Sequence, residues 1–204
     1  MNFRTTNIVE NDDLKIKLLS YDDSNPDDLD LRYLSEEERQ KYHGFISSKR
    51  KLEYFYTRLL WSHFNINMPI SYLPSGKPYI SKGHISISHS KNKIAIAYSK
   101  DCEIGLDIEH FNDKIFRIAS KFISPYEHAH FDLSNHQLLT TIWSIKEAVY
   151  KLVNIPGLRF KEDICVLEIE KTNRVEVELS FSKKHLTFER MTFDSYILTY
   201  CLLD

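Results

Sequence analysis

The sequence contains no long hydrophobic run: no stretch approaches the roughly 18 consecutive apolar residues that a membrane-spanning helix needs. Its first residues, 1–13, lack the apolar core of a secretory signal peptide. The three cysteines are odd in number and far apart, which favours neither a disulfide framework nor a zinc ligand set. These absences predict a cytoplasmic protein that does not enter a membrane.

An excess of charge of one sign is also missing. The chain carries 27 Lys and Arg against 29 Asp and Glu, a net charge of −2, so it has no general attraction to nucleic acid or anionic lipid. Any anion binding must come from local clusters of cations. With only five glycines, long flexible loops are not expected, and 204 residues suffice for one sizeable core or two small ones.

The stretch GLDIE at 105–109 has the alternation of a β-strand. Strand side chains point to opposite faces in turn, so Asp107 and Glu109 project from the face opposite Ile104, Leu106 and Ile108. Two neighbouring carboxylates repel unless a cation or a proton lies between them. This strand is therefore a candidate cation site, the alternative being an exposed edge with ordinary acids.

The stretch WSIKEAVYK at 143–151 is typical of a helix. Glu147 and Lys151 lie one turn apart and outside its apolar stripe, which comprises Leu138, Ile142, Ile145, Val149 and Leu152. A third carboxylate and nearby lysines could then face the acidic strand, as a site for a divalent cation and a polyphosphate would require. The alternative is a surface ion pair worth only about 0.3–0.5 kcal/mol.

A longer helix is predicted to begin near Ser47 or Ser48 and to carry Lys49, Arg50 and Lys51 in its first turn. Cations oppose the helix dipole at that end. A bound phosphate would relieve the conflict, because amide donors and cations would converge on it. A solvated basic turn is the alternative.

The remaining patterns predict mostly strands after residue 160 and helices between 111 and 153. Capping boxes are predicted at Ser35–Glu38, Ser124–Glu127 and Ser134–Gln137. Strands are predicted at 14–20, 84–90, 93–99, 103–109, 164–170, 175–181, 186–189 and 195–203, with the second to fourth forming a meander, and 111–124 is predicted as one helix.

His89 has the strand parity of Ile85 and Ile87. It is either a core histidine or a residue at the strand's end, where alternation lapses. From the residues alone the core position is favoured.

Five motifs occur together in one order: GKP at 76–78, ISHS at 87–90, GLDIE at 105–109, FISPYE at 122–127 and WSIKEAVYK at 143–151. In order and spacing they resemble the surfactin-type 4′-phosphopantetheinyl transferases, over roughly residues 45–160. The resemblance implies an α+β fold with two pseudo-twofold-related lobes, 1–100 and 101–204. Each lobe would hold a three-stranded antiparallel sheet packed with a long helix, with coenzyme A in the cleft between them.

The activity implied is transfer of the phosphopantetheine arm of coenzyme A to a serine hydroxyl of an apo acyl or peptidyl carrier protein. The reaction uses Mg²⁺ and releases adenosine 3′,5′-bisphosphate. A monomer is expected, because the two lobes already supply both sides of the cleft.

By the same resemblance, Asp107, Glu109 and Glu147 are the magnesium ligands. Because the serine proton must leave, Glu147 is also the most economical general base, directly or through a metal-bound water, the alternative being that it only holds the metal. Lys146 and Lys151 match the lysines that meet the phosphates and the pantetheine region, and Glu147 and Lys151 are the catalytic pair.

The coenzyme contacts implied are Ser88 and His89 beside the phosphates, Lys77 in the cleft, and Lys49 or Arg50 at the 3′-phosphate. The match reverses the core position favoured for His89.

The apolar residues Ile115, Phe116 and Phe122 follow the acidic strand and are either carrier contacts or core. Two other functions stay open: a magnesium-dependent nuclease or phosphohydrolase, and a non-catalytic module that binds coenzyme A or a carrier. The near-neutral charge counts against nucleic acid. The intact acids count against a non-catalytic module.

Overall fold

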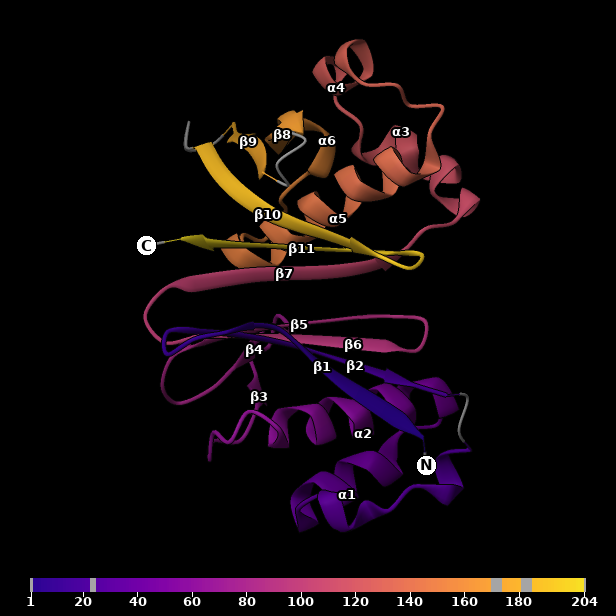
Figure 1. Cartoon of the computed structure of the whole chain (residues 1–204), viewed down its shortest axis with the longest axis vertical. Coiled ribbons are helices and arrows are strands. Elements are labelled where there is room, and N and C mark those ends of the chain that lie inside the picture. The colour runs from indigo at the N-terminus through magenta and orange to yellow at the C-terminus, as the bar shows by residue number, and fades with distance from the viewer. Residues whose placement is uncertain (1, 23–24, 170–173, 181–184, 204) are drawn as a thin grey trace.

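The computed structural model describes residues 2–22, 25–169, 174–180 and 185–203 and places an antiparallel sheet in each half of the chain (Figure 1). The first sheet has the strand order β1-β2-β6-β5 and the second β7-β11-β10-β9-β8. The α+β class predicted from the sequence is confirmed, with four and five strands in place of the expected three per sheet. Within the described residues, no helix is long and apolar enough to cross a membrane.

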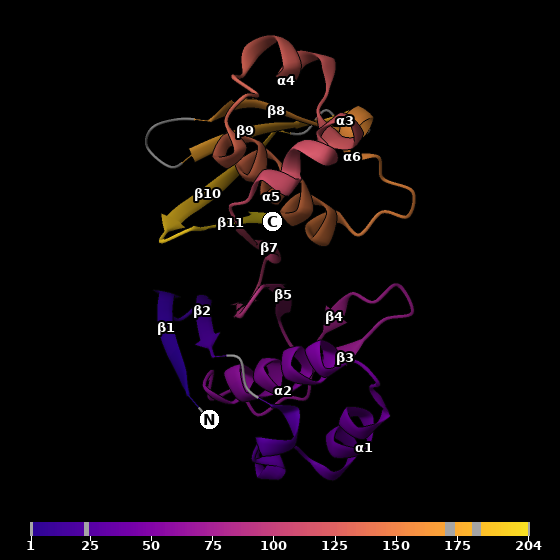
Figure 2. The same ribbon diagram turned by 90° about the vertical axis from the view of Figure 1, so that its right-hand side faces the viewer.

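The N-terminal lobe packs its sheet on helix α2 (Figure 2). Ser47 caps α2 by accepting a hydrogen bond from the amide of Arg50, and Phe55, Tyr56 and Leu59 of the helix are fully buried. The elements of this lobe are β1 (Phe3–Glu10), β2 (Leu14–Tyr21), η1 (Pro26–Asp28), η2 (Leu31–Tyr33), α1 (Glu36–Gly44), α2 (Ser48–Ser62), β3 (Ser71–Tyr72), β4 (Pro78–Tyr79), β5 (His84–Ser90) and β6 (Lys93–Ser99).

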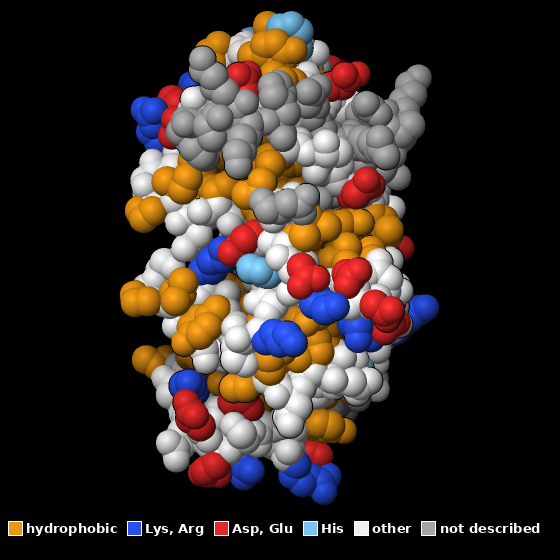
Figure 3. Space-filling model, turned by 90° about the vertical axis from the view of Figure 1, so that its left-hand side faces the viewer, with side chains coloured by type: hydrophobic (Ala, Val, Ile, Leu, Met, Phe, Trp, Pro, Cys, Tyr) orange, Lys and Arg blue, Asp and Glu red, His pale blue; other side chains and the backbone are white. Residues whose placement is uncertain are grey.

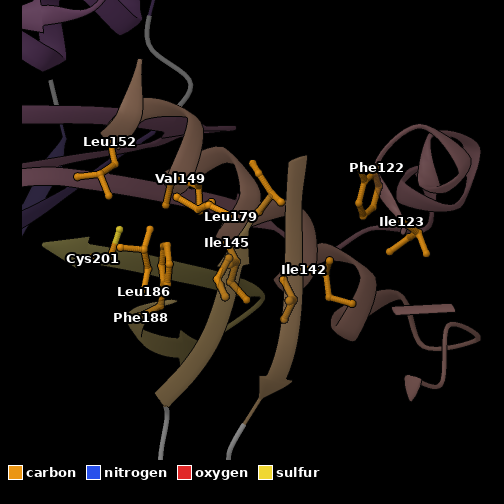
Figure 4. Packing of buried hydrophobic residues seen from close by; sticks show 14 of the residues in the cluster. Phe122, Ile123, Ile142, Ile145, Val149, Leu152, Leu179, Leu186, Phe188 and Cys201 are labelled. Carbon is orange, nitrogen blue, oxygen red and sulfur yellow. The ribbon is translucent and has the colours of Figure 1, made fainter. Parts of the chain in front are cut away.

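The C-terminal lobe packs its sheet on helix α5. Figure 4 shows Ile142, Ile145, Val149 and Leu152 of this helix among buried side chains of the strands, as the apolar stripe predicts. The elements of this lobe are β7 (Glu103–His110), η3 (Asp113–Arg117), α3 (Ala119–Phe122), α4 (Pro125–His130), α5 (His136–Val153), α6 (Phe160–Asp163), β8 (Ile164–Ile169), β9 (Arg174–Leu179), β10 (His185–Phe193) and β11 (Tyr196–Leu203).

The two sheets meet through a third apolar cluster, to which β2 and β6 contribute from one lobe and β7 and β11 from the other (Figure 1). Its members include Ile16, Leu18, Ile104, Leu106 and Ile108. The face of β7 that carries Ile104, Leu106 and Ile108 is thus buried in the contact between the lobes. The odd-numbered face, which carries the acids, is left for α5.

The predicted meander is wrong, because β7 pairs with β11 and not with the first sheet. Strand β6 already has β2 on one edge and β5 on the other, so no edge is left for β7. Strand β1 has no counterpart among the predicted strands.

Two of the predicted helix features also differ. The single helix predicted over 111–124 is two short pieces, η3 and α3, which join at Ile118. Helix α5 is capped by Asn135 and not by the predicted Ser134. The Asn135 side chain accepts hydrogen bonds from two backbone amides in the first turn of α5. The capping boxes at Ser35 and Ser124 are confirmed. Residues 170 and 181, the predicted ends of two strands, lie outside the described residues.

Candidate active site between the lobes

Asp107 occupies the centre of a polar cluster built by β5, β7 and α5. Its side chain is almost entirely buried, with the residue 3% exposed. Oδ1 accepts hydrogen bonds from the Lys151 ammonium at 2.7 Å and from the Ser88 hydroxyl at 2.8 Å. The predicted residues Asp107, Lys151 and Ser88, which lie far apart in the sequence, are therefore in direct contact.

Glu109 lies on the same face of β7, two residues further on. Its Oε2 accepts from the Ser90 hydroxyl at 3.0 Å and its Oε1 from the Trp143 indole at 3.1 Å. Burial, followed by the charge of Asp107, raises the pKa of Glu109 to about 7. Sequence reasoning did not select Ser90 and Trp143 as site residues, although Ser90 shares the strand parity of Ser88 and Trp143 opens the helical motif.

Glu147 joins the two strand acids from α5, one turn before Lys151. Burial raises the pKa of the Glu147 carboxyl to about 7, and the charges of Asp107 and Glu109 add to the effect, while Lys151 opposes it. The structure thus brings three acids from two distant segments close enough to repel one another. The sequence-based function further requires that the three acids meet at one metal ion, which stays a prediction.

Gly105 sets how closely α5 approaches the acidic strand. A Cβ atom at this position would lie 2.1 Å from the carbonyl oxygen of Ala148 and 2.9 Å from Cβ of Leu152. Real side-chain atoms cannot stand that close to backbone, so only glycine lets the helix lie where Glu147 and Lys151 reach β7.

We expect Gly105→Ala to push α5 away from β7. Overpacking of this kind costs about 1–3 kcal/mol, so the free energy of unfolding measured by urea denaturation should fall by that amount. The site is also expected to open, because α5 carries two of its side chains. Gly44→Ala is the matched control, since a Cβ at Gly44 meets nothing within 4 Å. Equal stability of the two variants would contradict the close approach.

The chemistry of the donors fits a divalent cation. Asp107 Oδ2 is buried and has no hydrogen-bond partner within the described residues, and an orphaned carboxylate oxygen is costly unless a cation meets it. Carboxylate oxygens are the ligands that Mg²⁺ prefers. Over the described ranges, no three His, Cys, Asp or Glu side chains are already gathered into a set that could hold a metal ion. The assignment of Asp107, Glu109 and Glu147 as its ligands therefore stays a prediction.

Lys146 does not face this cluster. Its side chain is 0% exposed and its ammonium donates to a carboxylate oxygen of Glu127 at 2.8 Å and to the carbonyls of Phe122 and Phe160 at 2.5 and 2.9 Å. All three ammonium protons are used inside the C-terminal lobe. The predicted phosphate contact of Lys146 is thus replaced by a structural ion pair.

Lys77 reaches from the N-terminal lobe to the other lobe. Its ammonium lies 3.1 Å from Glu103 of β7 and donates to the carbonyl of Leu152 at the end of α5. Figure 3 shows lysine, acidic and histidine side chains together in the hollow between the lobes. A cavity of about 570 Å³ is lined by Lys77, His84 and Glu103. Lys77 is therefore in a cleft, as expected, but is already paired there.

His89 and Arg50 line a larger cavity of about 830 Å³ between α2, the β3–β4 ribbon and β5. His89 is not a core residue, because its side chain is 45% exposed. Partial burial of the ring lowers the pKa of His89; the charge of Glu53 opposes this shift, and the charge of Lys151 adds to it. Lys49 lines an adjoining cavity of about 400 Å³ together with Arg50 and His89.

The apolar residues after β7 divide into core and surface. Ile115 and Phe122 are buried, whereas Phe116 is 43% exposed on η3. Only Phe116 of the three stays a candidate carrier contact.

In a comparison with protein-family models, residues 103–201 match the model of the 4′-phosphopantetheinyl transferase superfamily (ACPS). The matched segment is just under half of the chain and runs from β7, with its acids, to β11. None of the curated proteins matches the chain. The match supports the superfamily and phosphopantetheine transfer as its chemistry, and does not distinguish the surfactin type.

Proposed function

We propose that this protein is a surfactin-type 4′-phosphopantetheinyl transferase, which moves the phosphopantetheine arm of coenzyme A to a serine hydroxyl of an apo carrier protein and releases adenosine 3′,5′-bisphosphate. The observation that carries the proposal is the contact of Lys151 with Asp107, with Glu109 and Glu147 near enough for the charge of Asp107 to raise their pKa values, within a segment that matches the superfamily. A protein of net charge −2 needs such local clusters to bind a polyphosphate.

The acids are proposed to hold Mg²⁺, which when bound would neutralise charge on the pyrophosphate of coenzyme A. Lys151 is the chain's own cation at this point, and it stabilises the charge that develops on the leaving phosphate. Ser88 fixes the Asp107 carboxylate by donating to Oδ1, and Trp143 does the same for Glu109. Each acid thereby keeps one orientation.

Glu147 is the proposed general base for the serine hydroxyl. Asp107 and Glu109 each accept two hydrogen bonds from neighbouring side chains. The assignment to Glu147 therefore rests on geometry: no hydrogen bond from a neighbouring side chain occupies its carboxylate in the described part of the chain, so it is the acid left to accept the serine proton, directly or through a water.

The cavity of about 830 Å³ is proposed to take the nucleotide end of coenzyme A. Arg50 and His89 line it, so a 3′-phosphate there would meet the Arg50 guanidinium from α2 and the His89 ring from β5. Strand β5 sends Ile87 and His89 to this cavity and Ser88 and Ser90 to the acids. One strand therefore links the two parts of the site.

The proposal is tested by incubating the protein with coenzyme A, Mg²⁺ and apo carrier proteins of the fatty-acid, polyketide and peptide-synthetase types. The expected result is an added phosphopantetheine of roughly 340 daltons on the carrier serine, seen by mass spectrometry, with stoichiometric adenosine 3′,5′-bisphosphate. Omission of Mg²⁺ is the control. Hydrolysis of a nucleotide substrate with no adduct on any carrier would favour a phosphohydrolase instead.

Carrier docking is proposed on the exposed surface of η3, which follows β7 directly. Phe116, Lys114 and Arg117 are exposed there. We expect the double variant Lys114→Glu/Arg117→Glu to raise KM for the carrier about 10-fold, since charges at an interface rim steer association, and to leave KM for coenzyme A unchanged. Lys82→Glu, an exposed position of the N-terminal lobe, is the control. Equal changes in both KM values would contradict docking at η3.

A further inference from the structure

Glu53 of α2 is a buried carboxylate in a wall whose other charged residues are lysines and arginines. The residue is 8% exposed and lines both the cavity of about 830 Å³ and the adjoining one of about 400 Å³. A buried acid is costly unless it is paired, so its retention beside a phosphate-binding surface calls for a physical reason.

The partners of Glu53 supply that reason. His89 Nδ1 lies 3.3 Å from Oε1 of Glu53, and the Lys49 ammonium lies 3.5 Å from the same oxygen. The histidine comes from β5 and the lysine from the first turn of α2, so one carboxylate oxygen joins two elements of the cavity wall. The acid is itself held in place by burial, whereas Lys49 has a long and exposed side chain.

We propose that Glu53 is a positioning residue of the coenzyme site: it accepts the Nδ1 proton of His89, so that the ring can take a second proton on Nε2 as the phosphate binds and donate it to a phosphate oxygen, and it keeps Lys49 beside the same cavity. The inference rests on the proposed function and adds to it a residue that makes no contact with the phosphate. A ring nitrogen fixed by a carboxylate is the usual way in which a histidine is given one orientation.

A simpler role for Glu53 predicts the opposite change in the affinity for coenzyme A when Glu53 is removed. If the carboxylate only lowered the positive charge of the wall, its removal would strengthen the binding of an anion. If it positions His89 and Lys49, its removal weakens binding although the wall becomes more positive.

The first test is the Kd of coenzyme A by calorimetry for the wild type, Glu53→Leu and Glu53→Gln. We expect Glu53→Leu to bind about 10-fold more weakly, as for loss of one hydrogen bond to a charged group. Glu53→Gln keeps an acceptor oxygen and should bind within about 3-fold of the wild type. The control is Asp113→Leu, which removes a similar pair with His136 Nδ1 at 3.2 Å far from the cavity. Unchanged or tighter binding by Glu53→Leu would overturn the proposal.

The second test does not depend on the proposed function. In the free protein, ¹H–¹⁵N spectra of the histidine rings, with His89 assigned by a His89→Asn variant, should show a proton on Nδ1 that Glu53→Leu removes or exchanges to Nε2. A His89 ring without that proton in the wild type would overturn the inference even if coenzyme A binds, or if Glu53→Leu does not fold. A wild type that does not bind coenzyme A, with the histidine signature present, would instead overturn the proposed function.

Discussion

Replacing Asp107 by Asn is expected to abolish phosphopantetheine transfer while the protein stays folded. The substitution keeps the shape of the side chain but removes the charge that Lys151 and Ser88 meet at Oδ1 and the orphaned Oδ2 that the proposed cation would take. Loss of one preorganised charge at a reacting centre lowers kcat by about 10²–10³-fold. Because the variant should also lose the cation, we expect its kcat to fall by about 10³-fold or more.

Stability should move little in the same variant. Asp107 repels Glu109 and Glu147, whose pKa values are both raised to about 7, and an amide relieves that repulsion. Lys151 loses its ion pair, but its side chain is 25% exposed and water compensates. We expect the free energy of unfolding to stay within about 1 kcal/mol of the wild type or to rise, as at many functional sites. Ser180→Ala, at an exposed position of the C-terminal lobe, is the control. Near-normal turnover by Asp107→Asn would refute the metal assignment.

The acidic strand could be predicted from the sequence because its information is local. The two-residue period of GLDIE fixes that Asp107 and Glu109 share a face, whatever the strand pairs with. The capping boxes at Ser35 and Ser124 could be predicted for a similar reason, because the N-cap residue and the residue three positions later decide the outcome. Two arguments predicted that Glu147 and Lys151 face Asp107 and Glu109. One was the resemblance, and the other was the position of Glu147 and Lys151 outside the apolar stripe of their helix.

The strand partners could not be predicted in the same way. Strand β7 pairs with β11, some 90 residues further on, although β5 and β6 are its nearest neighbours in the sequence. The choice is set by β2, which occupies the edge of β6 that a meander would use. The residue pattern of an apolar strand does not show which of several sheet edges is free to pair with it.

Lys146 shows that the resemblance and the helix pattern can disagree. It lies four residues after Ile142 and three before Val149, so helix geometry puts it beside the buried stripe and not with Glu147. A lysine at such a position requires a buried acceptor. The acceptor, Glu127, is recognisable in the sequence only as a capping-box residue.

The pair formed by Lys146 and Glu127 gives the largest expected effect on stability. Both side chains are 0% exposed and 2.8 Å apart. Glu127 also accepts from the amides of Ser124 at 2.7 Å and Val166 at 2.8 Å, so its charge is fully hydrogen-bonded. The network joins the loop before α4, strand β8 and helix α5 at the residue that precedes Glu147.

We expect Lys146→Met to lower the free energy of unfolding by about 3–5 kcal/mol, because it leaves the Glu127 carboxylate buried without a counter-charge. Chemical denaturation followed by circular dichroism measures the change. The double variant Lys146→Met/Glu127→Gln should recover more than half of the loss, since a buried pair costs less to replace than to break. Lys121→Met, at an exposed position on α3, is the matched control. A loss below about 1 kcal/mol in Lys146→Met, or a double variant less stable than the single one, would show that the pair does not hold α5 against α4 and β8 as its geometry requires.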